Sequence, residues 1–273
     1  MAGMADRAKP ELGAVQQTLF IPLAARARET RRRRPVLQDP KAAEILASVD
    51  FDTRKYSRGW GGGVTVLRTA IFDCWVSDFL TEHPGGTVVE LGTGLNTRFE
   101  RVGNGQAHWI DLDLPDTIEL RRRFFADSAR RRMVAASVLD QGWPSAVAEC
   151  PEPYLFAAEG VLAYLEQAPQ VIARVARAFP GALLAFDTYS QRMLEQQHKQ
   201  AARKNMAARW AWSCDDPRTL ESLGLKVVQQ AAVTRPPPDL RRRLPRRYRY
   251  ALPLASRIAG DLATVTLFRA SSH

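Results

Sequence analysis

The stretch that decides the fold reads VVELGTGLNT and runs from Val88 to Thr97. Its β-branched start predicts a strand over Thr87–Leu91. The glycines that follow, Gly92 and Gly94, permit backbone conformations and a close ligand approach that a side chain would forbid. A strand, an acidic residue and a Gly-x-Gly turn that leads into a helix are typical of a nucleotide-binding α/β domain. Taken alone, the turn is equally compatible with a purely structural role.

The spacing of the glycines distinguishes between cofactors. A dinucleotide fingerprint has a third glycine three positions after Gly94, where this chain has Thr97. S-adenosylmethionine carries no pyrophosphate and therefore needs less of a phosphate cradle. It does need an anion near its ammonium group, and Glu90 in the predicted strand suits that need. The turn therefore favours S-adenosylmethionine as the cofactor.

Further acidic residues lie where such a cofactor would bind. Asp113 closes the second predicted strand 19 residues after Gly94, and a carboxylate at this place can accept hydrogen bonds from both ribose hydroxyls. It also suits the start of a helix at Pro115, and Asp111 is the second choice for the ribose. Glu159 follows the fourth predicted strand, at the edge where open α/β sheets bind ligands. Its alternative is a solvated helix-cap residue.

The rest of the chain alternates predicted strands and helices, which is typical of an α/β fold with a mostly parallel, doubly wound sheet. The expected helices cover residues 11–35, 39–49, 64–80, 97–102, 115–126, 168–179 and 191–209, with a glycine-rich break at 59–63. The seven expected strands are Thr87–Leu91, His108–Leu112, Met133–Ala136, Tyr154–Ala158, Ala182–Asp187, Leu225–Val233 and Ala263–Arg269.

We expect a single domain over residues 1–273, because a chain of this length can bury one large core. Within it, the expected parts are an N-terminal helical cap (1–66), a cofactor-binding core (67–190), a helical lid insertion (191–224) and C-terminal strands with an arginine- and proline-rich insertion (225–273). Residues 191–209 leave the carboxyl end of the fifth strand, where such sheets bind ligands. We therefore expect them to cover the active site together with the N-terminal helices.

The net charge of +10 raises nucleic acid, a membrane surface or an acidic substrate as a partner. The arginine runs 121–123, 130–132 and 241–243 can contact phosphates, and residues 246–250 interleave arginine with tyrosine as a single-strand binder does. Solvated helix faces explain such runs better, and no RNA-binding module is recognisable. Nucleic acid is therefore not the expected partner.

Composition also bears on the compartment. No apolar run approaches the roughly 20 residues of a membrane span, so no membrane association is expected. The N-terminus lacks the apolar core and cleavage site of a secretory signal. Cys74, Cys150 and Cys214 are odd in number and far apart, which favours a reducing cytoplasm over a disulfide framework. The four histidines are scattered, and no metal site is expected.

Several blocks distributed along the chain form a recognisable set. They are QTLFIPL (17–23), Arg26 with Glu29, DPKAA (39–43), LRTAIFD (67–73), ELGTGLNTRF (90–99), WIDLDLP (109–115), AEGVLAYL (158–165) and WSCDDP (212–217). Together they resemble the leucine carboxyl methyltransferase superfamily, and more closely its bacterial branch of polyketide-type O-methyltransferases. The resemblance covers most of the chain and is looser in the C-terminal half. It implies a class I methyltransferase fold (Rossmann-like) and S-adenosylmethionine as the cofactor.

The resemblance also implies roles for single residues. Arg68 should pair with the carboxylate of the cofactor's methionine part, although its sequence position alone suggests a surface ion pair. The other implied cofactor-binding residues are Gly92 and Gly94 beneath the cofactor, Asp113 at the ribose, Val138 and Leu139 at the adenine, and Glu159 at the amino end. Two positions depart from the family pattern. Asn96 replaces a usual aspartate, which is expected to weaken a hydrogen bond at the turn, and Ala24 replaces a common aromatic residue, which is expected to reshape the substrate entrance.

The expected activity is methyl transfer to a carboxylate or hydroxyl oxygen of a small metabolite, polyketide-like or another natural product. The alternative is an RNA- or protein-modifying methyltransferase, or a nucleic-acid-binding protein that uses its arginine runs. A carboxylate is ionised at neutral pH, whereas a phenol or alcohol is helped by a base. No base can be assigned, and Tyr164, Asp187 and Tyr189 are the candidates for lining the acceptor pocket. The absence of histidine at these strand ends favours a carboxylate. We expect an anionic acceptor, which the arginines at 241–243 and 246–247 would help to bind.

Overall fold

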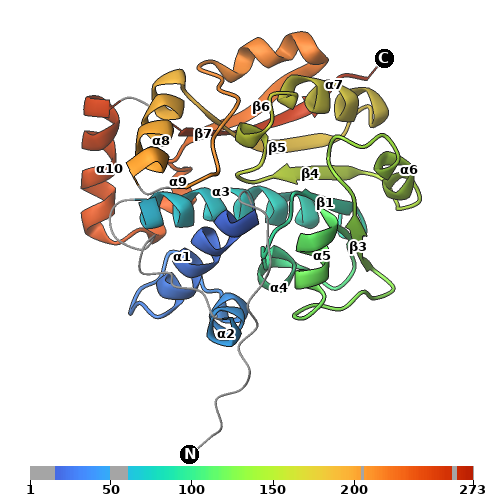
Figure 1. Cartoon of the computed structure of the whole chain (residues 1–273), viewed down its shortest axis with the longest axis horizontal. Coiled ribbons are helices and arrows are strands. Elements are labelled where there is room, and N and C mark those ends of the chain that lie inside the picture. The colour runs from blue at the N-terminus through green and yellow to red at the C-terminus, as the bar shows by residue number, and fades with distance from the viewer. Residues whose placement is uncertain (1–15, 50–60, 204–205, 260–262, 273) are drawn as a thin grey trace, which may run out of the picture.

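A computed structural model describes residues 16–49, 61–203, 206–259 and 263–272. Its centre is a seven-stranded sheet in the order β3-β2-β1-β4-β5-β7-β6 (Figure 1). Strands β1 to β5 are parallel, and β7 is antiparallel to β5 and β6. The expected α/β fold with a mostly parallel seven-stranded sheet is confirmed. The strands are β1 (Thr87–Leu91), β2 (His108–Asp113), β3 (Arg131–Ala135), β4 (Tyr154–Ala158), β5 (Leu183–Tyr189), β6 (Leu225–Ala232) and β7 (Ala263–Ala270).

Helices cover both faces of this sheet. Helices α3, α4, α9 and α10 contribute to one core, and α6 and α7 contribute to the core on the other face. Helices α1 and α2 pack on each other and share a third core with α5. The helices are α1 (Phe20–Thr30), α2 (Pro40–Ser48), α3 (Gly61–Glu82), α4 (Arg98–Val102), α5 (Pro115–Arg121), α6 (Trp143–Ala148), α7 (Ala168–Ala178), α8 (Gln191–Arg203), α9 (Pro238–Arg243) and α10 (Arg246–Ala259).

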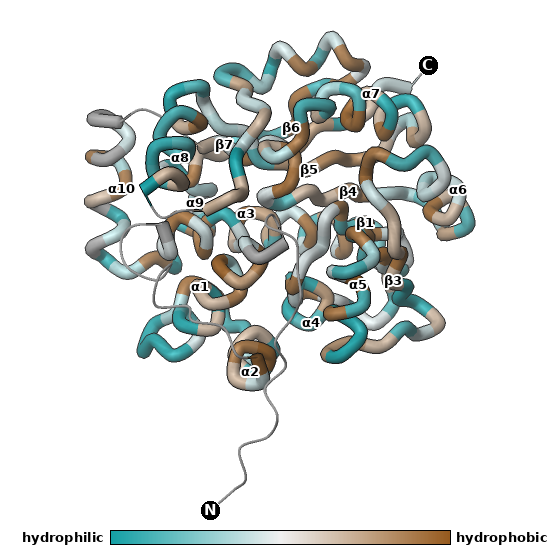
Figure 2. Tube along the Cα trace, in the orientation of Figure 1, coloured by the Kyte–Doolittle hydropathy of each residue, from teal (hydrophilic) through white to brown (hydrophobic). Residues whose placement is uncertain are grey.

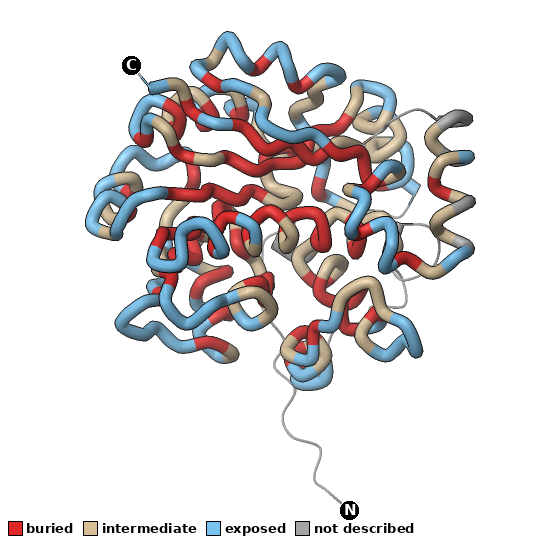
Figure 3. The backbone as a smooth tube through the Cα atoms, turned by 180° about the vertical axis from the view of Figure 1, so that it is seen from behind, coloured by how far each residue is buried: buried red, intermediate tan, exposed pale blue. Residues whose placement is uncertain are grey.

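The central strands are apolar on both faces because both faces are covered. Val88 and Leu155 pair across β1 and β4 and belong to the core under α3, whereas Val89 and Phe156, one position on, pair in the core under α7. This alternation is the two-residue period of a strand, and a parallel sheet buried on both faces reads as a continuous apolar run. Figure 2 shows the strands as the apolar centre of the molecule, and Figure 3 shows the same segments buried.

Helix starts follow the sequence signals closely. Asp39 caps α2, because its Oδ1 accepts a hydrogen bond from the backbone N of Ala42 at 2.9 Å, and Pro40 occupies the first turn, where its missing N–H costs nothing. Pro115 opens α5 in the same way. The described helices include none that is long and apolar enough to cross a membrane.

Several predicted boundaries are wrong. Helix α1 ends at Thr30, so the arginines at 31–34 follow the helix, and residues 11–15 lie outside the described ranges. Glycines 61–63 begin α3 instead of breaking the chain; residues 59 and 60 are not described. Helix α5 ends at Arg121, five residues early, where the backbone N of Arg123 bonds to the oxygen of Leu120 in a turn. Tight turns at helix ends satisfy the last carbonyls, which single-sequence patterns do not reveal.

Three helices were not predicted. The prolines 236–238 suggest a break, yet Pro238 is the first residue of α9, and α10 follows within the same arginine- and proline-rich segment. Leu240 and Leu252 carry these helices into the core under α3. Helix α6 is only 6 residues long, and short helices give little periodicity to detect.

Candidate active site

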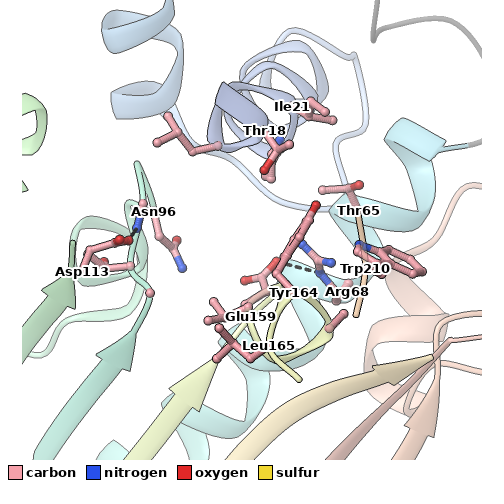
Figure 4. A pocket seen from close by; sticks show the side chains of 18 of the residues that line it. Thr18, Ile21, Thr65, Arg68, Asn96, Asp113, Glu159, Tyr164, Leu165 and Trp210 are labelled. Carbon is pink, nitrogen blue, oxygen red and sulfur yellow. Dashed lines mark hydrogen bonds and ion pairs between the residues drawn. The ribbon is translucent and has the colours of Figure 1, made fainter. Parts of the chain in front are cut away.

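A cavity of about 720 Å³ opens at the carboxyl ends of the parallel strands. Residues that follow β1, β2, β3 and β4 line it, together with residues of α1, α3 and α8. Figure 4 shows Asp113 on one side of it and Trp210 on the other, with Glu159 and Arg68 between them. The volume lies within the range of roughly 300–1,000 Å³ that is typical of small-molecule sites. Open α/β sheets bind their ligands at this edge.

The turn after β1 is shaped by two glycines. Gly92 and Gly94 have φ values of +64° and +51°, in the left-handed region that favours glycine. A Cβ atom on Gly92 would stand 2.5 Å from Cγ2 of Val161, so the turn also touches the segment that follows β4. Both glycines line the cavity. A ligand can therefore approach the backbone here without meeting a side chain.

Asp113 lines the cavity at the end of β2. Its Oδ2 accepts a hydrogen bond from the backbone N of Gly94 at 2.7 Å, and its Oδ1 accepts one from the backbone N of Leu114 at 2.7 Å. Burial raises the pKa of this carboxyl above its ordinary value. A carboxylate offers about four lone-pair sites, so each oxygen can still accept a bond from a ligand hydroxyl.

Asp111, the second choice for the ribose, is saturated by the protein. It is fully buried and is not among the described residues that line the cavity. Its Oδ1 lies 2.9 Å from Oγ1 of Thr93 and 2.9 Å from Nη2 of Arg121, and its Oδ2 lies 2.8 Å from Nε of Arg131. Despite burial, these two arginines lower the pKa of Asp111. Of the two aspartates, Asp113 is the one that a ligand can reach.

Arg98 ties together three acidic side chains under the cavity. Its Nη1 donates to Glu90, its Nη2 to Glu159 and its Nε to Asp73, the last at 2.8 Å. The side chain is fully buried. Burial raises the pKa of Glu90 in spite of Arg98. No role for Arg98 was predicted, although it follows the glycine turn directly. Nothing in the sequence indicates that β4 and α3 lie beside this side chain.

Glu159 follows β4 and lines the cavity. Its Oε1 accepts from Nε of Arg68 at 3.2 Å and from Oγ1 of Thr69 at 2.6 Å. Burial opposes the charged form, yet Arg68 and Arg98 lower the pKa of Glu159 to about 2. The side chain is only 6% exposed. Glu159 is therefore an ionised group at the cavity wall and not a solvated helix cap.

Arg68 stands on α3 and is 12% exposed, so it is not a surface ion-pair residue. Its Nη1 donates to Oδ2 of Asp187 at 3.0 Å and to the hydroxyl of Tyr189 at 2.6 Å. A Cβ atom on Gly160, whose φ is +70°, would stand 3.0 Å from Nη2, so glycine makes room for the guanidinium. Within the described residues, Nη2 has no hydrogen-bond partner, which leaves it available to a ligand at the cavity.

Arg26 brings the N-terminal helices to the site, a role that sequence reasoning missed. It is 2% exposed and lines the cavity. Its Nη2 donates to the oxygen of Leu95 at 2.9 Å, across 69 positions, and its Nε donates to Oδ2 of Asp39 at 2.8 Å. The same Oδ2 accepts from Oγ1 of Thr97 at 2.5 Å and from Nη1 of Arg101 at 2.9 Å. Helices α1 and α2 are thereby fixed to the glycine turn.

The two residues predicted at the adenine lie at different places relative to the cavity. Val138 lines the cavity and Leu139 does not. A tight turn over residues 137–140, in which the backbone N of Ser137 bonds to Oδ2 of Asp140 at 2.8 Å, leaves Leu139 39% exposed. Ser137 lines the cavity instead.

The three residues predicted at the acceptor lie at different places relative to the cavity. Tyr164 and Tyr189 line the cavity, whereas Asp187 does not. Asp187 is turned into the protein, because its Oδ1 accepts from the backbone N of Gly160 at 2.7 Å and its Oδ2 bonds to Tyr189 and Arg68. Asp187 therefore holds Tyr189 and Arg68 in place from within the protein.

Of the two departures from the family pattern, only Asn96 lies at the cavity among the described residues. Asn96 lines the cavity and makes two long bonds of 3.3 Å, to Oε2 of Glu90 and from Nη2 of Arg101. Ala24 is buried in α1 and is not one of the described cavity-lining residues.

Two of the arginine runs each contain an arginine that is buried. Arg121 and Arg131 are buried, pair with Asp111 and lie over the ring of Phe125 at 4.3 and 4.9 Å. They hold β2, β3 and α5 together and are not free to contact phosphates. The arginines at 241–243 are exposed, and none is among the described residues that line the cavity.

The fold has counterparts among solved structures. A putative methyltransferase from Thermobifida fusca matches with a TM-score of 0.55 and 19% identity over 98% of this chain and 97% of that one. The plantazolicin methyltransferase BpumL in complex with SAH matches with a TM-score of 0.50 and 10% identity over 95% and 100% of the two chains. At these identities the likeness concerns the fold, which is that of the methyltransferases.

The amino-acid sequence is similar to that of a methyltransferase family and its members. The family model "Leucine carboxyl methyltransferase" matches residues 20–179. The tetracenomycin polyketide synthesis O-methyltransferase TcmP of Streptomyces glaucescens is 34% identical over 80% of this chain and 83% of that protein. An S-adenosyl-L-methionine-dependent methyltransferase of Gibberella zeae, dpfgK, is 26% identical over 84% and 85%.

Fold and site define the class of the S-adenosylmethionine-dependent methyltransferases. The residues at the cavity fit that cofactor: an open backbone at Gly92 and Gly94, reachable carboxylates at Asp113 and Glu159, and a guanidinium nitrogen on Arg68 that has no partner among the described residues. The chain belongs to the leucine carboxyl methyltransferase family. The expected family and the expected cofactor are confirmed.

Proposed function

We propose that the chain transfers a methyl group from S-adenosylmethionine to a carboxylate or hydroxyl oxygen of a small metabolite. The observation that carries this proposal is the cavity at the sheet edge, in which Asp113 and Trp210 line opposite sides. The relative TcmP, an O-methyltransferase by name, supports oxygen as the acceptor atom. The cavity lies between the sheet edge, α1 and α8, and its volume of about 720 Å³ suits a small molecule better than a folded RNA.

The two sides of the cavity bind different molecules in this proposal. We call the side lined by Gly92, Gly94, Asp113, Val138 and Glu159 the cofactor compartment. There Asp113 accepts hydrogen bonds from the ribose, Glu159 receives the amino end and Arg68 binds the carboxylate. We call the side lined by Ile21, Tyr164, Met193, Gln196 and Trp210 the acceptor compartment.

When bound, S-adenosylmethionine supplies an electrophilic methyl group on a sulfonium that is already a good leaving group. The residues therefore have to hold the acceptor oxygen in line and exclude water. Helix α1, fixed to the glycine turn by Arg26, and helix α8 close the cavity on the solvent side in this proposal. In-line alignment of this kind can lower a reaction barrier by about 7–11 kcal/mol, and a misplacement of about 1 Å is costly.

The acceptor oxygen has to be anionic without much help from the protein. No histidine is among the described residues that line the cavity. Burial and the neighbouring Asp187 keep the pKa of Tyr189 well above its ordinary value, so this phenol is protonated at neutral pH and is no base. The described cationic side chains at the cavity are Arg26 and Arg68; Arg26 is paired with Asp39, and Arg68 binds the cofactor in this proposal. The lack of a base among the described lining residues favours a carboxylate or an acidic phenol as the acceptor. The compartment that we propose for the protein is the cytoplasm.

The test is methyl transfer from isotopically labelled S-adenosylmethionine to a panel of aromatic carboxylic acids and phenols, with bulk tRNA and protein beside them. The expected product is a small-molecule methyl ester or aryl methyl ether. Alkaline hydrolysis separates the two, because only the ester releases methanol. Label found on nitrogen or carbon, or on RNA or protein alone, would overturn the proposal.

A further inference from the structure

Trp210 stands in the acceptor compartment against a fixed support. Its ring lies over the ring of Tyr189, with centroids 4.1 Å apart and planes at 32°. Tyr189 is held by Nη1 of Arg68, at 2.6 Å from its hydroxyl, and donates to Asp187. Trp210 is half-buried and lines the cavity, where Figure 4 shows it opposite Asp113. A flat apolar ring therefore stands at the wall of the cavity with a rigid ring beside it.

Two consecutive side chains of α8 hold the backbone of Trp210. Oε1 of Gln197 accepts from its N at 3.2 Å, and Nε2 of His198 lies 2.7 Å from its O. Nε2 of Gln197 also donates to the oxygen of Ala208 at 3.1 Å. One position on, the N of Ala211 donates to the oxygen of Ala163 at 2.7 Å. Trp210 is therefore fixed on both sides of its peptide and does not lie on a free loop.

The cavity face of α8 is neutral. Its lining residues follow a helical spacing, and they are Met193, Gln196, Gln197, Gln200 and Ala201. A helix face at this spacing is usually apolar, whereas three amides stand here. The charged residues Arg192, Lys199 and Arg203 are exposed and do not line the cavity. This wall offers hydrogen bonds to the edge of a ligand without selecting for charge.

We propose that Trp210 is a specificity-determining residue, whose indole face is the platform for a planar ring of the acceptor. Gln197 and His198 are the positioning residues that set this platform. Aromatic rings gain from offset stacking beyond the burial of their area, by about 0.5–1.5 kcal/mol, and a preformed platform loses little entropy on binding. The acceptor is then a flat ring system that carries the reacting oxygen at its edge. This inference rests on the proposed function, because it assumes that the acceptor compartment receives the methyl acceptor.

A matched pair of ligands tests the platform. 2-Naphthoate is planar, and decahydro-2-naphthoate has the same skeleton and charge without the planar rings. Their affinities are measured by calorimetry on the full chain with saturating S-adenosylhomocysteine. The wild-type chain should bind 2-naphthoate about two- to tenfold more tightly, as stacking of this strength predicts. Trp210→Ala should remove the preference, Trp210→Phe should keep most of it, and Gln197→Ala and His198→Ala should reduce it.

Lys199→Ala is the matched control, because Lys199 is exposed on the same helix, and it should leave the preference unchanged. S-adenosylhomocysteine affinity reports on folding in every variant, and Trp210→Leu replaces Trp210→Ala if the latter fails to bind it. The proposal is overturned if wild type binds the two ligands equally or binds neither, or if the preference survives in Trp210→Ala and Trp210→Leu. Methyl transfer to nitrogen instead of oxygen would sink the proposed function while the stacking preference could still stand.

Discussion

The two sides of the cavity are built by different means. The cofactor compartment rests on buried charges, in which Arg98 joins three carboxylates and Asp111 joins two arginines. The acceptor compartment is neutral, with amides, methionines and a stacked tryptophan held by Gln197 and His198. Buried charge pairs fix the geometry of the first side, whereas apolar faces and amides are more easily reshaped by substitution.

This contrast explains where sensitivity to mutation should lie. Buried ion pairs cost several kcal/mol when one partner is removed, because the other charge stays buried without compensation. Stacking and neutral hydrogen bonds contribute less each. Changes in the cofactor compartment should therefore affect folding and cofactor binding, and changes in the acceptor compartment should affect the choice of acceptor.

The largest effect is expected for Arg98→Ala. Three carboxylates lose a buried partner, so the free energy of unfolding should fall by about 3–5 kcal/mol, measured by urea denaturation. Arg132→Ala is the matched control, since Arg132 and its partner Glu149 are 46% and 65% exposed, and it should cost less than about 1 kcal/mol. Equal losses in both variants would mean that the buried network contributes no special stability.

The next effect depends on pH. The pKa of Glu159 is lowered from 4.5 to about 2 in the folded chain, so its charged form contributes stability above pH 4.5 that is lost as pH falls toward 2. That contribution is about 3 kcal/mol at neutral pH. The stability gap between wild type and Glu159→Gln should therefore be widest at neutral pH and should narrow below pH 4.5, in denaturation curves taken at several pH values. A gap that does not change with pH would contradict the assignment.

Substitution of Asp113 should weaken cofactor binding, whereas substitution of Asp111 should weaken folding. Asp113→Ala removes two hydrogen bonds to the ribose of about 1.5 kcal/mol each, so S-adenosylhomocysteine affinity should fall about a hundredfold. Asp111→Ala leaves Arg121 and Arg131 without their buried partner and should lower the melting temperature while the folded protein keeps its affinity within a few-fold. Unchanged affinity in a folded Asp113→Ala protein would remove the ribose role from Asp113.

The smallest effect is expected at the arginines 241–243, which are exposed and away from the cavity wall. Their reversal to glutamate should leave cofactor affinity intact and should raise the KM for an acidic acceptor a few-fold at low salt, because exposed charges steer an anion and are screened by salt. An increase in KM that persists at high salt would instead indicate direct contact with the acceptor.

The cofactor compartment was largely predictable because its signals are local. The glycine turn, Asp113 and Glu159 follow predicted strands, and the strand order of a parallel sheet brings their ends together. Arg26 was not predictable, since its bond to Leu95 spans 69 positions. Helix α9 was hidden by prolines at its start. The position of Trp210 at the cavity was not predictable either. It depends on a hydrogen bond with Gln197, 13 residues earlier, and on ring contact with Tyr189.

The most direct test of the division between the two compartments is calorimetric titration of S-adenosylhomocysteine into wild type, Trp210→Ala and Asp113→Ala. Trp210→Ala should bind S-adenosylhomocysteine within about twofold of wild type, since the indole is not in the cofactor compartment, while Asp113→Ala should bind it about a hundredfold more weakly. A loss in Trp210→Ala as large as that in Asp113→Ala would contradict the division and show that both walls of the cavity hold the cofactor.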